Sequence, residues 1–179
     1  MKRVFFPRAE TVLDGIYVEL VRSLYAAFIP SLIMSVGFIA GGCLAVRETG
    51  DMTLAIIVAL GTLTSLIRLA VAFGGRKEAF DTGLGLARAQ RLEQYFAVAY
   101  LAFAACLGAY CVRIFTLPAP EAHLFTVTML VGYGAGVSAG MALRPRLAIA
   151  SMAFGIVPGV TAAFMVPNES YWATAAMMT

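Results

Sequence analysis

Two arginines lie inside apolar stretches of the sequence, where a charged side chain is costly and marks a functional candidate. Arg68 is about five residues from one end of the run Met52–Phe73, and Arg113 is about four residues from the opposite end of Tyr95–Leu117. Either side chain can extend to the lipid headgroups, or it can face inward and bind a ligand or an acidic side chain. Because the two arginines lie near opposite membrane faces, we do not expect them to form one site.

A histidine and a glutamate stand together where the fourth apolar run, Leu124–Leu143, begins. His123 follows Glu121 by two residues. Histidine titrates near physiological pH, so this pair is a candidate for sensing pH outside the cytoplasm or for binding a cation. The alternative is that His123 is an ordinary polar anchor at the membrane interface.

Glycines recur at a spacing of four in two of the apolar runs. Gly132, Gly136 and Gly140 form one row, and Gly37 and Gly41 repeat the spacing once. Such rows let two helix backbones approach closely in lipid. They predict either tight helix contact within one bundle or a functional surface, which would be a dimer seam or a narrow ligand crevice.

The fifth run contains Pro158, which should kink its helix because proline removes a backbone hydrogen bond. Motifs of self-contained enzymes are missing from the sequence: it has no Walker loop, no GxSxG, no HExxH and no paired carboxylates in an apolar run. Three cysteines and one histidine do not suggest a metal cluster. We therefore predict no catalytic residue, no metal and no cofactor for these residues.

Composition places these residues in a membrane. The chain has 179 residues, of which 61% are hydrophobic and 13% charged, with a mean hydropathy of +0.86. Soluble domains carry about 25% charged residues, and disordered chains are polar rather than apolar. The net charge of +3 is too small to predict nucleic-acid binding. The composition predicts a polytopic membrane protein.

The predicted fold is an all-α bundle of transmembrane helices, because helices satisfy their own backbone groups in lipid. We expect a cytoplasmic amphipathic segment at 1–23 and a transmembrane domain at 24–179. A basic cytoplasmic loop is expected at 74–94, with a surface helix at Leu84–Leu92. A sixth run begins at Ser170, is too short to span by Thr179, and is expected to continue beyond it or to form an interfacial tail. Five runs are long enough to span: Leu24–Val46, Met52–Phe73, Tyr95–Leu117, Leu124–Leu143 and Leu147–Val166.

Lysine and arginine predict the orientation of the chain. Ten of them fall in the N-terminal segment, the 74–94 loop and the Arg144–Arg146 turn, whereas the opposite loops hold Arg47 alone. Cytoplasmic loops are enriched in these residues, so the N-terminus is predicted to be cytoplasmic.

Three passages resemble the N-terminal membrane region of alphaproteobacterial GGDEF and GGDEF–EAL proteins. They are VELVRSLY at Val18–Tyr25, RLEQYF at Arg91–Phe96, and VGYGAGVSAG at Val131–Gly140, which is followed by RPRLAI at Arg144–Ile149 and then by Pro158. Members of that family similarly have a glycine-rich helix, an Arg–Pro turn and a proline-bearing helix.

The resemblance implies a membrane-anchoring and sensory domain of a cyclic di-GMP signalling protein in the bacterial inner membrane. The whole protein would then be a diguanylate cyclase or phosphodiesterase, with a cytoplasmic GGDEF or EAL domain that these residues do not include. It also implies a homodimer, because cyclase domains act as pairs. The alternatives are a small accessory subunit of a larger membrane complex and a transporter.

Overall fold

The computed structural model describes residues 9–26 and 28–165, and helices are the only regular elements among them. The predicted all-α fold is therefore confirmed for this part of the chain. The predicted sixth run at 170–179 lies outside the described residues. The helices are α1 (Ala9–Ala26), α2 (Phe28–Thr49), α3 (Met52–Ala79), α4 (Leu86–Phe115), α5 (Pro120–Gly140), α6 (Pro145–Gly155) and α7 (Val157–Met165).

Five helical stretches are long and apolar enough to cross a membrane, as the sequence predicts. They are Gly15–Thr49, Met52–Ala79, Leu86–Phe115, Pro120–Gly140 and Pro145–Met165. The last stretch comprises α6 and α7. Many large apolar side chains point outward along these helices, such as Ile33 on α2 and Leu63 on α3. An outward apolar surface of this kind is stable only in contact with lipid or another apolar partner.

The polar stretch 74–94 is mostly helical, which corrects the expected extent of the loop. Helix α3 continues through Gly74 and Gly75 to Ala79, and α4 is already helical at Leu86, so only residues 80–85 lie between them. The predicted surface helix at Leu84–Leu92 is instead the beginning of the long helix α4. Basic residues at the end of α3 interact favourably with its dipole, which helps the helix to extend past the apolar run.

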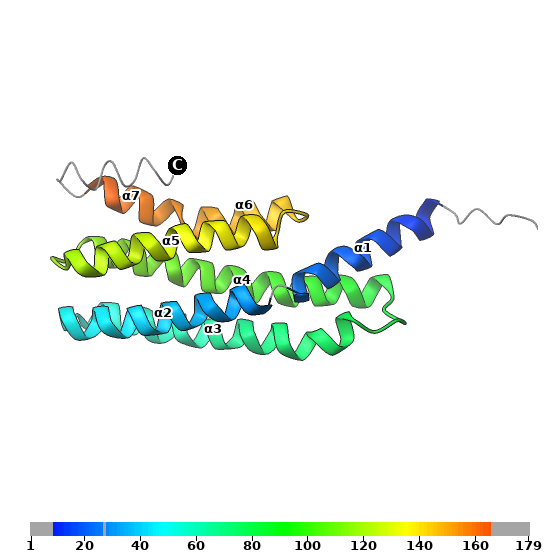
Figure 1. Ribbon diagram of the computed structural model, residues 1–179, viewed down its shortest axis with the longest axis horizontal. Coiled ribbons are helices and arrows are strands. Elements are labelled where there is room, and N and C mark those ends of the chain that lie inside the picture. Colours follow the sequence, from blue (N-terminus) through cyan, green and yellow to red (C-terminus); the bar gives the residue numbers. More distant parts are fainter. Residues whose placement is uncertain (1–8, 27, 166–179) are drawn as a thin grey trace, which may run out of the picture.

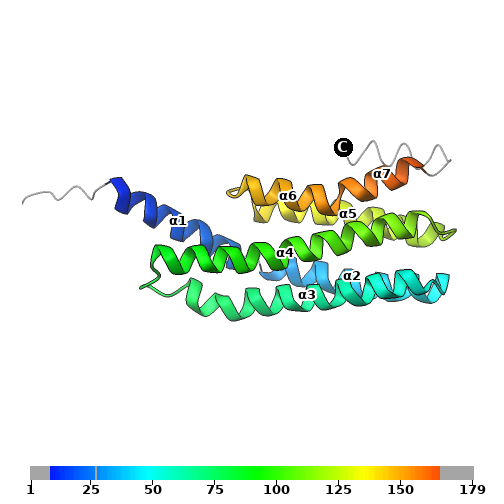
Figure 2. The same cartoon turned by 180° about the vertical axis from the view of Figure 1, so that it is seen from behind.

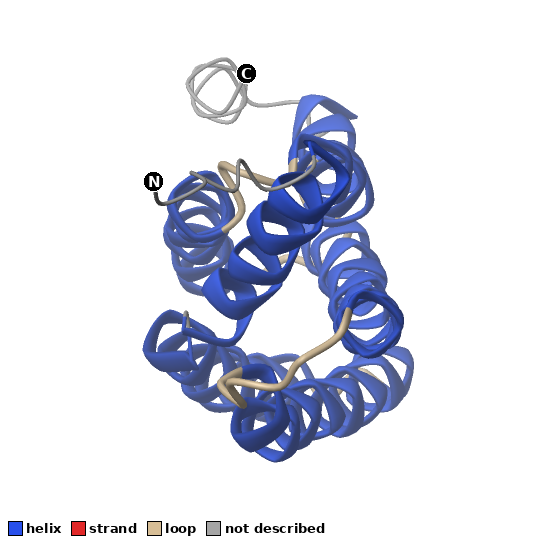
Figure 3. Cartoon of the chain, turned by 90° about the vertical axis from the view of Figure 1, so that its right-hand side faces the viewer, coloured by secondary structure: helices blue, strands red, loops and turns tan. Residues whose placement is uncertain are grey.

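Helix α4 is the central element of the bundle. It packs against α1, α3, α5, α6 and α7, while α2 packs on α3 and α5. Figures 1 and 2 show α2 to α5 running side by side, with α1 projecting obliquely beyond the bundle at one end. Figure 3 views the bundle from the α1 end, so that most of its helices are seen nearly end on. The chain turns between α3 and α4 and between α5 and α6 lie at the same end as α1.

Proline and glycine together create a close helix contact on α4. The helical run that contains Pro158 divides at Ile156 into α6 and α7. Pro158 has no N–H to donate to the carbonyl of Phe154, four residues earlier. That carbonyl faces Gly108 of α4 so closely that a Cβ at Gly108 would lie 2.1 Å from the Phe154 oxygen. The interrupted helix can therefore sit on α4 only where α4 has no side chain.

Helix α1 is attached to the bundle by polar contacts of Arg22 and Tyr17. Arg22 donates hydrogen bonds to the carbonyls of Ala79 (3.0 Å) and Asp81 (2.8 Å), at the end of α3. The hydroxyl of Tyr17 donates to Glu93 of α4. Glu93 also forms an ion pair with Arg144 at 3.0 Å, and the Arg144 guanidinium lies 4.5 Å from the centre of the Tyr17 ring. The Tyr17–Glu93–Arg144 cluster therefore joins α1, α4 and the turn before α6.

We expect the substitution Gly108→Ala to destabilise the bundle by about 1–3 kcal/mol, the usual range for overpacking. The added methyl group would meet a backbone carbonyl, which no side-chain rotation can move away. Thermal unfolding in detergent should show a lower midpoint. Gly74→Ala in α3 is the matched control, because a Cβ there meets no atom within 4 Å. A Gly108→Ala midpoint equal to that of Gly74→Ala would contradict the close contact.

Candidate functional site: a cavity with a buried arginine

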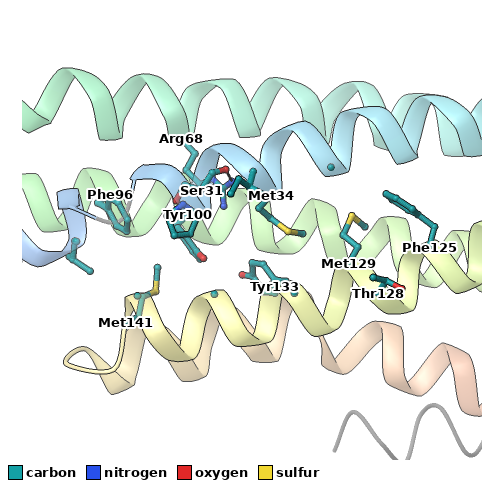
Figure 4. A pocket seen from close by; sticks show the side chains of 17 residues that line it. Ser31, Met34, Arg68, Phe96, Tyr100, Phe125, Thr128, Met129, Tyr133 and Met141 are labelled. Carbon is teal, nitrogen blue, oxygen red and sulfur yellow. Dashed lines mark hydrogen bonds between the residues drawn. The ribbon is translucent and has the colours of Figure 1, made fainter.

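A cavity of about 400 Å³ lies between α2 and α5, with α3 and α4 contributing to its wall. This volume lies within the range of small-molecule sites, which are mostly apolar with a few placed polar groups. Figure 4 shows Arg68, Ser31 and Tyr100 close together in one part of the cavity. Apolar side chains line the remainder, among them Met34 of α2 and Met129 of α5.

Arg68 reaches the cavity from α3 and is buried, with 2% of its surface exposed. Its Nη2 donates to the carbonyl of Ser31 and to the hydroxyl of Ser35, both at 2.9 Å. The guanidinium carbon lies 4.1 Å from the centre of the Phe103 ring and 5.1 Å from that of Tyr100. Arg68 therefore faces inward, and the interpretation that it extends to the lipid headgroups does not apply to it.

The charge of Arg68 has no carboxylate partner among the described residues. It takes part in none of their ion pairs, and no aspartate or glutamate among them lines the cavity. Its Nε is buried without a hydrogen-bond partner. Arginine keeps its proton in proteins, so the cavity contains a cation whose hydrogen-bonding capacity is only partly used. Aromatic rings and two acceptors reduce the cost of this burial without neutralising the charge.

The predicted glycine row forms one wall of this cavity. Gly132, Gly136 and Gly140 of α5 line it, and Gly37 of α2 lines the facing wall. A Cβ added at Gly37, Gly132 or Gly136 would meet no atom within 4 Å. These glycines therefore leave open space between α2 and α5.

Gly41, the other glycine of the predicted pair, makes a tight contact instead. A Cβ at Gly41 would lie 1.8 Å from the ring of Phe125, so α2 and α5 touch at this point. Phe125 also lines the cavity. The two helices thus meet at Gly41 and Phe125, and they leave the cavity between them along the row Gly132–Gly140.

The second intramembrane arginine, Arg113, forms an ion pair near the end of the bundle. Its Nε donates to Asp51 Oδ1 at 3.1 Å, and its Nη2 donates to the other carboxylate oxygen. Asp51 also begins α3, where its Oδ1 accepts from the Leu54 N–H at 2.6 Å. Hydrogen bonds from Arg113 lower the pKa of the Asp51 carboxyl below its usual value. Arg113 therefore connects α4 to the start of α3, and the structure does not bring it together with Arg68.

His123 holds the turn between α4 and α5. Its side chain is 5% exposed, and Nε2 lies 2.8 Å from the Ile114 carbonyl and 2.9 Å from that of Leu117. Both partners are acceptors, so Nε2 carries the hydrogen and donates it. Glu121 is exposed in the first turn of α5. Across residues 9–26 and 28–165, no cluster of three His, Cys, Asp or Glu side chains could hold a metal ion.

Sequence reasoning identified Arg68 and missed its surroundings. Ser31 and Ser35 are four residues apart, and Phe96, Tyr100 and Phe103 recur at a helical spacing, so each set lies on one helix face. Both spacings are visible in the sequence. The pairing of those faces with Arg68 depends on contacts between three helices, which spacing within one helix does not contain.

Comparison with known proteins gives no relative: no family, curated protein or solved structure shows a significant match to this chain.

We expect Asp51→Asn to reduce stability at neutral pH, because asparagine keeps the helix cap and removes the charge that faces Arg113. A lowered carboxyl pKa contributes stability above the unfolded-state value of 3.8 and loses it as the pH falls through the folded-state value. The difference in thermal midpoint between the wild type and Asp51→Asn should therefore be present at pH 7 and shrink below pH 3.8. If the difference in thermal midpoint is as large below pH 3.8 as at pH 7, the ion pair is not its source.

Proposed function

We propose that this chain is the membrane-anchoring and sensory module of a signalling protein of the bacterial inner membrane. The observation that carries the proposal is the cavity between α2 and α5, in which Arg68 is buried with no carboxylate partner among the described residues. A structural arginine in lipid is usually paired or placed near the headgroups. An unpaired one in a ligand-sized cavity is better explained as a binding residue.

We propose an N-terminus in the cytoplasm. The described basic residues concentrate at the end of the bundle that holds α1 and the α3–α4 turn, where α3 ends in Arg76 and Lys77. Arg144 and Arg146 lie at the beginning of α6, beside the α5–α6 turn at the same end. Loops rich in lysine and arginine face the cytoplasm.

The route from cavity to cytoplasm that we propose runs through α1. Leu24 of α1 and Pro30 of α2 both line the cavity. Farther along α1, Tyr17 contacts Glu93 and Arg144. A ligand that moves α2 relative to α5 would therefore change the position of α1 at the cytoplasmic end. Ligands act on such equilibria by binding one arrangement better than the other.

The output that we propose is cyclic di-GMP signalling by a cytoplasmic GGDEF or EAL domain. Support for it comes from the resemblance of Val18–Tyr25, Arg91–Phe96 and Val131–Gly140 to the membrane regions of those proteins. A homodimer belongs to this proposal, because cyclase domains act as pairs. For the glycine row Gly132–Gly140 we favour the ligand crevice over the dimer seam, because this row lines the cavity.

The intact mass of the natively expressed gene product tests this assignment. We expect a mass well above 19.0 kDa, with GGDEF or EAL motifs in the additional sequence. A mass of 19.0 kDa would contradict the cyclic di-GMP output. The chain would then be better explained as an accessory subunit, whose exposed apolar helices pack against a larger complex.

A further inference from the structure

We infer that the cavity between α2 and α5 binds a long-chain fatty acid, with its carboxylate on Arg68 and its hydrocarbon chain along the glycine row of α5. The inference rests on the proposed sensory function and names the ligand of the same site. It follows from the chemistry of the cavity, the depth of Arg68 in the membrane and the opening between the helices.

Arg68 supplies the group that selects an anion. A guanidinium presents planar N–H donors that match a carboxylate, and such pairs are stronger than neutral hydrogen bonds. Nη2 already bonds Ser31 and Ser35, whereas the buried Nε has no acceptor among the described residues. An incoming carboxylate would accept hydrogen bonds from the guanidinium where it lines the cavity, and it would neutralise the charge. Ser31 and the rings of Tyr100 and Phe103 would hold the guanidinium in place.

The remainder of the cavity suits a hydrocarbon chain. Its other lining groups are mainly apolar, including Met34, Phe125 and Met129, and its volume is about 400 Å³. Where Gly132 and Gly136 have no side chain, a flexible chain can lie against the backbone of α5. Figure 4 shows Met129 and Phe125 farther along the cavity than Arg68. The cavity therefore has one region beside Arg68 for a carboxylate and another, beside Met129 and Phe125, for a hydrocarbon chain.

The depth of Arg68 favours a fatty acid over a phospholipid. At 1.5 Å per residue, Arg68 lies about 16 Å from the end of α3 at Ala79 and about 24 Å from its beginning at Met52. With a hydrocarbon layer of about 30 Å centred on this helix, Arg68 is about 10 Å inside it. A phospholipid keeps its phosphate at the headgroup level. A fatty acid has only a carboxyl group at its polar end, which is small enough to lie below the headgroup level beside Arg68.

The opening to lipid lies between α2 and α5. Ile33 of α2 and Phe125 of α5 line the cavity and are exposed on the outer surface of the bundle. The contact of Gly41 with Phe125 closes the space between α2 and α5 at one end. Next to this contact, at Gly37 and Gly136, the space between the two helices is open. A ligand dissolved in the bilayer can therefore reach Arg68 laterally, without passing through water.

Equilibrium binding of radiolabelled palmitate tests the inference, using the full-length gene product in phosphatidylcholine nanodiscs. We expect saturable binding with one palmitate per chain, and we expect Arg68→Met to weaken it at least tenfold. Palmitate methyl ester, which has no charge, should bind wild type and Arg68→Met equally weakly. Arg113→Met is the matched control, because it removes the other intramembrane arginine, which lies outside the cavity and pairs with Asp51. This variant should keep the wild-type affinity.

A second variant covers the case in which Arg68→Met does not fold. Gly136→Leu places a side chain in the open space and leaves Arg68 intact, so we expect it to lower palmitate binding at least tenfold while the molecular mass of the assembly stays unchanged. Loss of a dimer in Gly136→Leu, with palmitate binding unchanged, would show that the glycine row is a dimer seam and would overturn the inference.

The fatty-acid inference is likewise overturned if Arg68→Met binds palmitate like wild type, or if copurified anionic phospholipid competes with palmitate. Binding is measured independently of cyclic di-GMP, so palmitate binding to a protein without a cyclic di-GMP domain would reject only the signalling proposal.

Discussion

The arrangement of the bundle depends on one buried arginine, Arg68, which has no carboxylate partner among the described residues. Placing such a charge in the middle of a helix inside lipid is costly, and the cost falls only if the surrounding helices supply compensating groups. Here α2 supplies Ser31 and Ser35, and α4 supplies the faces of Tyr100 and Phe103. Three helices thus converge on Arg68. These groups do not neutralise the charge, and the described residues offer no acid, so a carboxylate ligand in the apolar cavity would supply the missing negative charge.

The two intramembrane arginines differ in the side chains that surround them. Arg113 lies near the end of α4 and meets Asp51, so its charge is neutralised within the fold and it serves to join α3 to α4. Arg68 lies deeper, and the described residues offer it hydrogen-bond acceptors and aromatic rings but no acid. The same residue type is therefore neutralised by an aspartate in one place and left without an acid among the described residues in the other.

Much of the architecture could be predicted from the sequence, because the apolar runs have to be helices in lipid. The ends of the helices were less predictable. Helix α3 extends past its apolar run to Ala79, whose carbonyl accepts a hydrogen bond from Arg22 of α1. A contact between residues so far apart in the sequence leaves no local pattern. Spacing also found the row of Gly132 and Gly136, but it could not decide between helix contact and open space. That choice depends on the side chains of the facing helix, as the contrast with Gly41 and its Phe125 contact shows.

An electron cryo-microscopy structure of the full-length protein in lipid nanodiscs would show directly whether a ligand occupies the cavity beside Arg68. We expect the Arg68 guanidinium to lie between Ser31, Ser35 and the ring of Phe103, and an elongated non-protein density to run from it along Gly132 and Gly136. An Arg68 side chain that reaches the headgroups would contradict this expectation. So would a helix of a second copy packed into the space between α2 and α5.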